Sequence, residues 1–348
     1  MSDAPGIPPG ASLVPSAAQA ALLSAPSVPS ATSAASAATG PISVHRRVGS
    51  SSLRVFPIAL SGASFGWTAD ERATTSILDR FLELGGDFID TADSYAGGRS
   101  EIMIGNWMRR RGARDRLTIA TKVGKSADNP GLSARSVTAA VTASLSRLGV
   151  EAIDLLYLHV DDPTVPFDET LAAVDGLIRA GKVRHFGGSH HIADRLVAAR
   201  IASGQLGFAS MVALQNQYHL LHRDEVEGAL GLVAAQLDLG IMPRFALAAG
   251  FLAGRYRTRA DLEGSARGAT ASRYLNRRGL RVLSAVDRVA DDLGTHPAAV
   301  SLAWLLSRPR VVAPVVGVSA PEQLDAVMAA PSLGLGRHEL TELDRASA

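Results

Sequence analysis

Residues 86–95, Gly-Asp-Phe-Ile-Asp-Thr-Ala-Asp-Ser-Tyr, decide how the rest of the chain is interpreted. The apolar start of this stretch is typical of a short buried β-strand, which then ends on acidic residues and a tyrosine. Three later apolar runs end in a similar way, at Lys122, His159 and Ser189. Because the carboxyl ends of parallel strands gather at one edge of a sheet or barrel, the pattern predicts one shared site.

Short β-branched runs alternate with helix-like segments along most of the chain. A first strand is expected at residues 58–60, and seven further strands are expected to end near Ala92, Val123, His159, Ser189, Gln215, Phe245 and Val316. Helices are expected at residues 70–84, 99–111, 133–148, 168–180, 191–203, 223–239, 279–293 and 320–330, with an extra helix at 297–308 that starts at Pro297.

Most of these strand ends are separated by about 30 residues, the length of one βα unit. Eight such units predict an α/β fold, a (β/α)8 TIM barrel with a short N-terminal hairpin and extra helices. The alternative is an open doubly wound sheet. If that sheet bound a dinucleotide, it would carry a G-x-G-x-x-G stretch after an early strand, and the chain has none.

Composition indicates a globular protein with balanced charge. Hydrophobic residues make up 47%, enough for a sizeable core, and 35 Lys and Arg against 33 Asp and Glu give a net charge of +2. This balance predicts neither a nucleic-acid nor a membrane partner. The chain has no cysteine, which excludes disulfides and cysteine nucleophiles. Its only lysines are Lys122, Lys125 and Lys182, so a lysine at a strand end stands out among many arginines.

Residues 1–44 are rich in Ala, Ser and Pro and nearly uncharged, which predicts a disordered tail before a barrel at residues 45–348. No Lys or Arg precedes Arg46, and prolines interrupt the apolar stretches, so a secretory signal is not expected. No apolar run is long enough to cross a membrane. We therefore expect a cytoplasmic protein, monomeric or weakly homo-oligomeric.

The strand ends offer an acid, a phenol, an amine and an imidazole: Asp90, Tyr95, Lys122 and His159. A phenol is a weak acid at neutral pH, and a nearby lysine cation favours its phenolate. Asp90 would hold Lys122 charged, and His159 would donate a hydrogen bond to a carbonyl oxygen. Tyr95 would then deliver a proton as hydride reaches the carbonyl carbon.

Each of these residues alone has a simpler structural interpretation. A strand-end aspartate is often a helix cap, a loop tyrosine often packs, and a single histidine is often structural. Placement at three successive strand ends favours the catalytic interpretation. Lys182, in contrast, precedes an expected strand and is interpreted as structural.

Together these motifs resemble those of the aldo-keto reductases. The resemblance extends from His45 to Asp344 and rests on the segments Gly86–Tyr95, Gly97-Gly98-Arg99-Ser100-Glu101, Thr121-Lys122-Val123-Gly124, Asp154-Leu155-Leu156-Tyr157-Leu158-His159, Gly181-Lys182-Val183-Arg184 and Gln215-Asn216-Gln217-Tyr218. It implies a (β/α)8 barrel, NADP(H) as the usual cofactor with NAD(H) not excluded, and a small-molecule carbonyl substrate. It also implies that Asp90, Tyr95, Lys122 and His159 form the catalytic tetrad.

The resemblance also implies cofactor contacts after the later strands. Ser189 and Gln215 match residues that hold the nicotinamide carboxamide, and His190 stands where the family usually has asparagine. After the seventh strand the chain reads Met242-Pro243-Arg244-Phe245-Ala246-Leu247, and Arg244 and Leu247 are expected to contact the cofactor. Arg244 occupies the place of an aromatic residue that often stacks on the nicotinamide. A guanidinium can stack on a ring, but it repels the positively charged oxidised form.

Four further residues are expected to contact the phosphates and adenosine of the cofactor. Gly254-Arg255-Tyr256 and Ser265-Ala266-Arg267 resemble phosphate-binding segments of the family, and arginine pairs well with phosphate. Ser319 and Gln323 fit an adenosine site, where Ala326 and Val327 replace a common Glu-Asn pair.

The leading hypothesis is therefore an NAD(P)H-dependent reductase of aldehydes, ketones or sugar-like carbonyls. One alternative is a cofactor-sensing regulatory barrel with little catalysis, and another makes Lys122 the Schiff-base lysine of an aldolase-like barrel. The histidines His190, His191, His219 and His222 could suggest a metal site. A metal-dependent hydrolase barrel would want paired histidines on the first strand, which has none, so no metal is expected.

Overall fold

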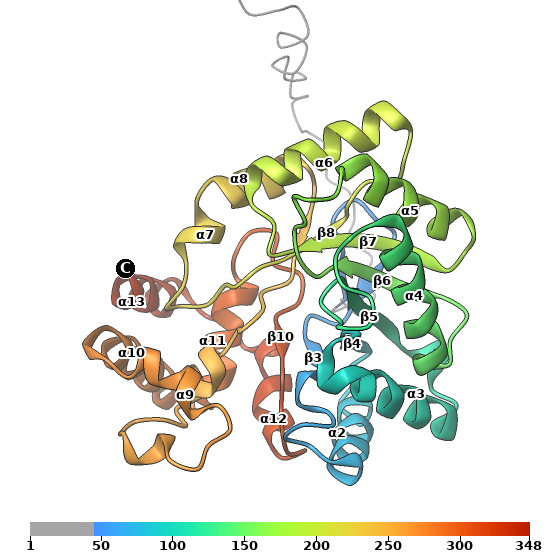
Figure 1. Cartoon of the computed structure of the whole chain (residues 1–348). Coiled ribbons are helices and arrows are strands. Elements are labelled where there is room, and N and C mark those ends of the chain that lie inside the picture. Colours follow the sequence, from blue (N-terminus) through green and yellow to red (C-terminus); the bar gives the residue numbers. More distant parts are fainter. Residues whose placement is uncertain (1–44) are drawn as a thin grey trace, which may run out of the picture. The chain divides into compact units, whose positions relative to one another are not determined.

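Eight parallel strands form one sheet in the structure, a computed structural model that describes residues 45–348 (Figure 1). Hydrogen-bonded neighbours follow the order β10-β3-β4-β5-β6-β7-β8-β9. The strands are β3 (Ala59–Ser61), β4 (Phe88–Asp90), β5 (Thr118–Val123), β6 (Ile153–Leu158), β7 (Val183–Ser189), β8 (Ala213–Gln215), β9 (Gly240–Ile241) and β10 (Val315–Val316). The predicted eight-stranded βα architecture is confirmed.

The two ends of this strand order are joined through residues 310–315. The Val312 N–H donates to the Ile241 carbonyl at 2.9 Å, and the Val315 N–H donates to the Pro243 carbonyl at 2.8 Å. β10 in turn pairs in parallel with β3. The sheet therefore closes on itself as a barrel, in which the carboxyl ends of all eight strands surround one opening.

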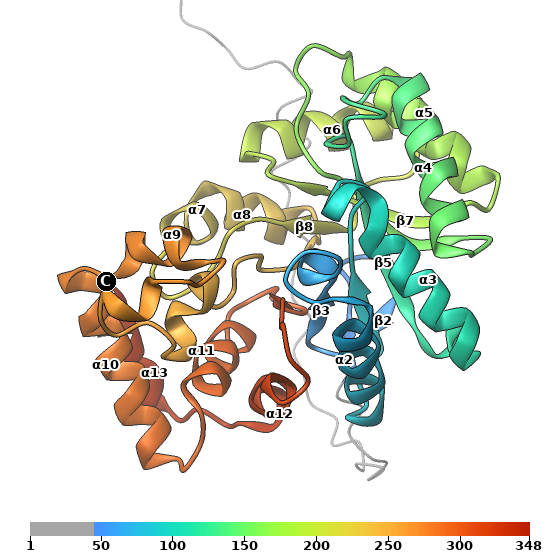
Figure 2. The ribbon, with the colours of Figure 1, turned by 60° about the horizontal axis from the view of Figure 1, so that its bottom comes forward.

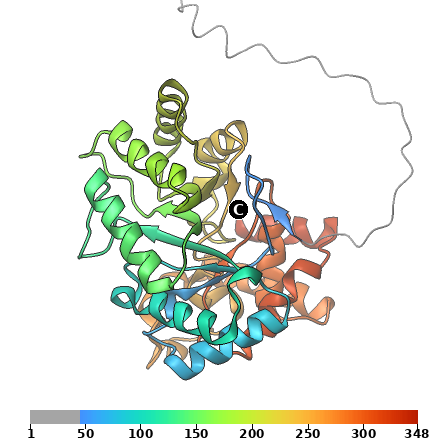
Figure 3. The same cartoon turned by 90° about the vertical axis from the view of Figure 1, so that its right-hand side faces the viewer.

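Helices surround the strands (Figure 2). They are α2 (Glu71–Glu83), α3 (Arg99–Arg111), α4 (Ala134–Leu148), α5 (Phe167–Arg179), α6 (Ala193–Leu206), α7 (Asp224–Glu227), α8 (Ala229–Gln236), α9 (Gly268–Ala271), α10 (Arg277–Asp292), α11 (Pro297–Leu306), α12 (Gln323–Met328) and α13 (Arg337–Ser347). Figure 3 shows the green helices of the first half and the red helices of the C-terminal part on opposite sides of the strands. No helix of residues 45–348 is long and apolar enough to cross a membrane.

Helix α2 illustrates how local sequence sets an element. The Asp70 side chain caps the helix by accepting from the Ala73 N–H at 2.8 Å, which satisfies one of the free amides of the first turn. The apolar residues Ile77, Leu78 and Phe81 recur at helical spacing and are fully buried. The helix therefore packs one face against the barrel and leaves its charged face in solvent.

Two of the predicted elements are divided or shortened in the structure. The helix expected at residues 223–239 is divided into α7 and α8 at Gly228, whose backbone leaves helical geometry (φ −93°, ψ −144°). The strand expected to end near Phe245 ends at Ile241. Pro243 has no N–H for a sheet ladder, and Phe245 adopts a left-handed conformation (φ 55°), so the apolar residues that follow turn away from the sheet.

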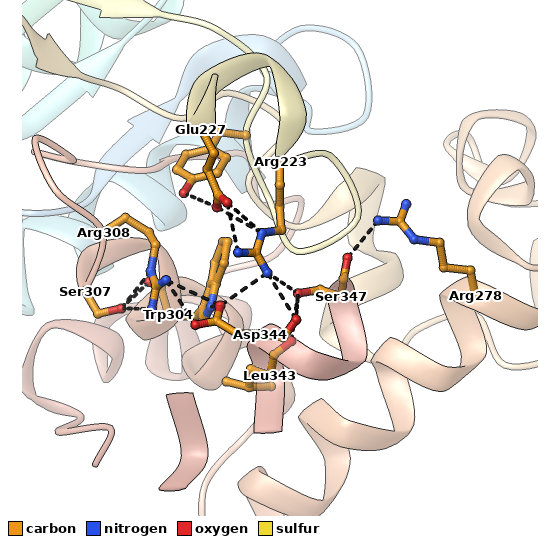
Figure 4. Close-up of polar contacts among 10 residues, drawn as sticks. Arg223, Glu227, Arg278, Trp304, Ser307, Arg308, Leu343, Asp344 and Ser347 are labelled. Atoms are coloured by element: carbon orange, nitrogen blue, oxygen red, sulfur yellow. Dashed lines mark hydrogen bonds and ion pairs between the residues drawn. The ribbon is translucent and has the colours of Figure 1, made fainter. Parts of the chain in front are cut away.

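Helix α13 was not among the predicted elements, and a polar network fastens it to the barrel (Figure 4). Asp344 accepts from the Trp304 indole N–H at 2.9 Å and pairs with Arg223 at 3.2 Å and Arg308 at 3.3 Å. The two guanidinium groups lie 5.3 and 4.7 Å from the buried Trp304 ring. Arg223 also donates a hydrogen bond to the Ser347 hydroxyl at 2.7 Å. The last turn of α13 is therefore held to the barrel at Asp344 and at Ser347.

A hairpin of β1 (Arg46–Arg47) and β2 (Arg54–Val55) closes the amino end of the barrel, where the sequence predicts a short N-terminal hairpin. Gly49 sits in its turn at φ 52°, and a Cβ there would lie only 2.2 Å from the Val212 carbonyl oxygen just before β8. Glycine is therefore required at this close approach. The predicted tail at residues 1–44 lies outside the described residues.

Candidate active site

Asp90 and Lys122 reach the carboxyl end of the barrel because side chains alternate along a strand. Asp90 lies two residues after Phe88, and Lys122 lies two residues after Ala120; Phe88 and Ala120 both belong to the inner core. His159 follows Tyr157 of the same core by two residues, directly after β6. The period of two therefore points all three polar side chains inward, at the same end.

Lys122 is the centre of the hydrogen bonds that result. Its ammonium group donates to an oxygen of Asp90, to the Thr91 carbonyl at 2.9 Å and to the Tyr95 hydroxyl at 3.3 Å. The other Asp90 oxygen accepts from the Gln215 side-chain amide at 2.8 Å. Lys122 and Asp90 are essentially inaccessible to solvent, so this pair of opposite charges is fully buried.

The electrostatics keep Lys122 charged. Burial alone would lower the pKa of its ammonium group, but Asp90 and then Tyr95 act in the opposite direction, and the pKa ends above its ordinary value. A buried lysine held as a cation is a fixed positive charge beside the Tyr95 oxygen. It is poorly suited to act as a free amine nucleophile.

Tyr95 is positioned by a sharp turn after β4. It begins a short 3-10 turn, η2 (Tyr95–Gly98), in which Ala96 and Gly97 have positive φ angles of 50° and 64°. The Lys122 nitrogen lies 4.9 Å from the centre of the Tyr95 ring. The His159 ring stands edge-on to that ring with 6.0 Å between centroids. The turn therefore brings the phenol back over the strand-end residues.

His159 is held as a neutral imidazole. Burial lowers its pKa to about 2, and the positive charges of Lys122 and Lys125 contribute to that fall. Its Nδ1 atom is buried and has no hydrogen-bond partner among the described residues. At physiological pH this side chain can donate or accept a hydrogen bond, but it has no proton to lose as an imidazolium acid.

A cavity of about 750 Å³ opens beside Tyr95 and runs toward the loop after β10. Of the nine residues predicted to bind a cofactor, seven line it: Gln215, Arg244, Leu247, Arg255, Arg267, Ser319 and Gln323. Its volume lies within the usual range for small-molecule and cofactor sites. The cavity therefore connects the phenol to the predicted cofactor residues.

Ser189 and His190 do not line this cavity and lie instead beside His159. The Ser189 hydroxyl donates to the Gln215 carbonyl at 2.9 Å, and His190 Nδ1 lies 3.0 Å from the His159 carbonyl oxygen. His190 adopts a left-handed backbone conformation (φ 58°). Asparagine and histidine are both enriched in that conformation, which accounts for histidine where asparagine was expected.

The far part of the cavity presents cationic and amide groups. Arg267 is half-buried and lies 5.5 Å from the centre of the Trp67 ring, with no ion pair among the described residues. The Tyr256 hydroxyl lies 2.7 Å from the Ser265 hydroxyl on the same loop. The Gln323 side chain accepts from the Ser319 N–H at 2.9 Å. A free half-buried guanidinium in a cavity suits an anionic group such as a phosphate.

Two buried acids, Asp93 and Glu101, stand on either side of the Tyr95 turn in the sequence, and neither was predicted to have a role. Glu101 is fully buried and accepts from the Thr121 hydroxyl at 2.6 Å and from Arg147 at 2.7 Å. Asp93 is buried beside it, and neither of its carboxylate oxygens meets the geometry of a hydrogen bond with a described residue, although the Ser94 and Gly124 backbones lie close enough to lower its pKa slightly. Both residues stand in the motifs quoted above, so their position in the sequence was visible but their burial was not.

The Asp93 environment predicts a pH-dependent stability. Burial, followed by repulsion from Glu101, raises the pKa of Asp93 to about 7 in the folded protein. The folded state therefore keeps a proton that the unfolded chain loses near pH 4, and the free energy of unfolding falls as pH rises from about 4 to 7. Asp93→Asn removes this titration, so the variant should gain stability over the wild type across that window, by up to about 4 kcal/mol.

Urea unfolding of both proteins at pH 5 and pH 8 measures this difference. Asp115→Asn, which neutralises an exposed carboxylate on the barrel surface, controls for the loss of one charge. The prediction would be contradicted if the difference in free energy of unfolding between Asp93→Asn and the wild type is no larger at pH 8 than at pH 5.

Two of the histidines that could suggest a metal site, His219 and His222, make contacts with other groups of the protein. His219 Nδ1 accepts from the Leu221 N–H at 3.2 Å, and His222 lies 3.0 Å from Glu225. Burial lowers the pKa of His219 to about 3. Within residues 45–348 no group of three or more histidine or carboxylate side chains is arranged to hold a metal ion.

Comparison with known protein families agrees with this geometry. The model of the aldo/keto reductase family matches residues 57–348, nearly the whole described chain. The chain belongs to the aldo/keto reductase family. Family membership makes it an oxidoreductase, and the (β/α)8 barrel is the fold that this membership leads one to expect.

Individual aldo/keto reductase relatives cover most of the chain. It is 31% identical to YrpG of Bacillus subtilis, named as an uncharacterised oxidoreductase, over 85% of this chain and 94% of that protein. It is 31% identical to the aldo-keto reductase dtxS3 of Metarhizium robertsii, over 84% of this chain and 88% of that protein. It is 29% identical to a probable voltage-gated potassium channel subunit beta of Arabidopsis thaliana, over 82% of this chain and 90% of that protein.

Proposed function

We propose that this oxidoreductase reduces an aldehyde, ketone or sugar-like carbonyl with NADP(H), and that Tyr95 is the general acid. The observation that carries the proposal is the Tyr95 hydroxyl, 3.3 Å from the buried Lys122 ammonium group and at the wall of a cavity of about 750 Å³. A proton donor beside a fixed cation, at the end of a cofactor-sized cavity, suits carbonyl reduction. We place the protein in the cytoplasm, as a monomer or weak homo-oligomer.

The four strand-end residues have separate parts in this reaction. His159, as a neutral imidazole, donates a hydrogen bond that orients the carbonyl oxygen. Tyr95 gives its hydroxyl proton to that oxygen, and Lys122 stabilises the phenolate that remains. Asp90 holds Lys122 in place. When bound, NADPH supplies the hydride to the carbonyl carbon, so the product is an alcohol.

The cofactor would be held along the cavity. Ser189, His190 and Gln215 lie closest to the catalytic residues and suit the carboxamide; Arg244 and Leu247 flank the nicotinamide position. Arg255 and Arg267 suit phosphate groups, and Ser319 with Gln323 suits the adenosine end. The half-buried Arg267 without an ion pair supports NADP(H), and NAD(H) is the weaker candidate.

Titration with NADPH and NADH, followed by a panel of aldehydes and ketones, tests this function. We expect NADPH to bind more tightly than NADH and to be oxidised in the presence of at least one carbonyl. Arg267→Met should reduce the ratio of NADPH affinity to NADH affinity. Arg259→Met, an exposed arginine of the same loop that does not line the cavity, is the matched control. Equal affinity for both cofactors, unchanged in Arg267→Met, would contradict the NADP(H) assignment.

The second candidate is a cofactor-sensing regulatory barrel with little catalysis. His190, Arg244, Ala326 and Val327 depart from the family pattern around the cofactor, and relatives named as probable potassium channel subunits share the fold family. Tight NADPH binding with no oxidation by any carbonyl of the panel would favour this candidate. The intact set of Asp90, Tyr95, Lys122 and His159 favours the reductase.

A further inference from the structure

Arg244 is a half-buried cation that forms no ion pair with an acid of the described residues. It lines the same cavity as Tyr95, and its guanidinium lies 4.5 Å from the centre of the neighbouring Phe245 ring. It makes no hydrogen bond or ion pair through its side chain with any residue between 45 and 348. Burial lowers its pKa, and this is offset only in part by Tyr95 and Glu225.

Other half-buried arginines of the described chain show how unusual this is. Nine of them donate at least one hydrogen bond: Arg46, Arg80, Arg114, Arg147, Arg195, Arg200, Arg223, Arg308 and Arg310. Arg244 and Arg267 are the two half-buried arginines in residues 45–348 that donate none, and both line the cavity. A partly buried charge without a partner is costly, so both positions suit a ligand anion.

A second unmatched cation, Lys125, lies near His159, because the His159 N–H donates at 2.9 Å to the carbonyl of Val123, two residues before Lys125. Lys125 follows β5 and the turn at Gly124, whose φ is 109°, and is exposed without an ion pair among the described residues. Burial of part of the side chain lowers its pKa, and Arg244 and Lys122 lower it further by repulsion. Lys122, Lys125 and Arg244 all act electrostatically on His159, and among the described residues only Lys122 has a carboxylate partner.

The carboxylates that act on Arg244 are already bonded elsewhere. Asp90 accepts from Lys122 and Gln215, and Glu225 accepts from Asn216 and lies 3.0 Å from His222. The neighbouring His190 adds no negative charge. The surroundings of His159 and Tyr95 therefore hold two positive charges that residues 45–348 leave unmatched.

We propose that the natural substrate carries an anionic group, a carboxylate or a phosphate, and that Arg244 and Lys125 bind this group while Tyr95 and His159 hold the carbonyl. This inference rests on the proposed reductase function and names the class of its substrate. Arg244 lines the cavity with Tyr95, beside the position proposed for the nicotinamide. Lys125 lies outside the cavity lining, two residues beyond Val123, whose carbonyl accepts from the His159 N–H at 2.9 Å. Arg255 and Arg267 serve the part of the cavity assigned to cofactor phosphates. A guanidinium and an ammonium group together suit either anion.

Matched pairs of aldehydes at saturating cofactor test the proposal. para-Carboxybenzaldehyde and para-formylbenzamide are nearly equal in size but differ by one charge, and glyceraldehyde 3-phosphate and glyceraldehyde make the corresponding phosphate pair. We expect kcat/KM to favour the anion in at least one pair by about tenfold or more. Added salt should reduce this preference. The pair with the larger ratio identifies the carboxylate or the phosphate.

Variants assign the preference to the two cations. Lys125→Met and Arg244→Met should each reduce the ratio of anionic to neutral kcat/KM severalfold, and the double variant should bring it close to one. Lys125 is exposed, so its replacement should not disturb folding even if Arg244→Met does. Lys182→Met, an exposed lysine before β7, is the control and should keep the wild-type ratio.

The outcomes separate the two claims. Reduction of the neutral aldehydes with ratios at or below one in both pairs would overturn the anionic substrate and leave the reductase standing. An anion preference that survives the double variant would also overturn the assignment to Arg244 and Lys125. No reduction of these four aldehydes or of any member of the wider panel of aldehydes and ketones would overturn the reductase itself, and this inference with it.

Discussion

Tyr95→Phe is expected to lower kcat for carbonyl reduction by about a hundredfold or more while leaving NADPH affinity close to that of the wild type. The substitution removes the one hydroxyl that lies 3.3 Å from Lys122 and keeps the ring that packs beside His159. Neither neighbour can replace the lost acid. His159 stays neutral with a pKa of about 2, and the pKa of Lys122 is raised by Asp90 and Tyr95 in spite of burial.

Single-turnover reduction of a reactive aldehyde, with cofactor affinity measured by fluorescence titration, gives both quantities. Tyr218→Phe is the matched control, because it removes another buried tyrosine hydroxyl, bonded to Glu227 at 2.8 Å, away from the cavity. It should cost some stability and retain turnover. Turnover near that of the wild type in Tyr95→Phe would remove Tyr95 as the general acid.

Lys122→Met is expected to lower the free energy of unfolding by about 3–5 kcal/mol and to abolish turnover. The substitution leaves the Asp90 carboxylate buried at the barrel end, where the Gln215 amide is its one remaining side-chain donor among residues 45–348. An uncompensated buried charge carries a large desolvation cost. The phenolate of Tyr95 would lose its stabilising cation at the same time.

The double variant Asp90→Asn with Lys122→Met separates stability from catalysis. It removes both charges, and the asparagine carbonyl can still accept from Gln215, so most of the lost unfolding free energy should return while turnover stays absent. Urea unfolding and aldehyde turnover measured on the two variants give the comparison. A single variant as stable as the wild type would show that the pair is not energetically coupled.

Periodicity was enough to predict most of the fold. Apolar runs at strand length and caps such as Asp70 or Pro297 are local signals, and the elements they predict are present. Helix α13 was missed because its apolar residues are few, and much of its attachment depends on Trp304 and Arg223 from distant segments. The early end of β9 was signalled in part by Pro243, which cannot donate to a sheet ladder, but the left-handed turn at Phe245 could not be predicted from the φ preference of phenylalanine.

The candidate site divides in the same way. Alternation along strands predicts that Asp90, Lys122 and His159 share one end, and the structure brings them together with Tyr95. Which cations lack an ion-pair partner cannot be predicted from the sequence, because the partner of an arginine is often a residue far away in the chain. Lys125 received no role for that reason, although it was one of the chain's few lysines.

The contact between Arg267 and Trp67 has a practical consequence. The chain has three tryptophans; Trp107 and Trp304 are buried, whereas Trp67 is 58% exposed with its ring 5.5 Å from an arginine that lines the cavity. A molecule that draws Arg267 toward a phosphate would change the surroundings of this one indole and leave the other two as they are. The protein thus carries an intrinsic fluorescent reporter at the cavity, and occupancy can be followed without attaching a dye.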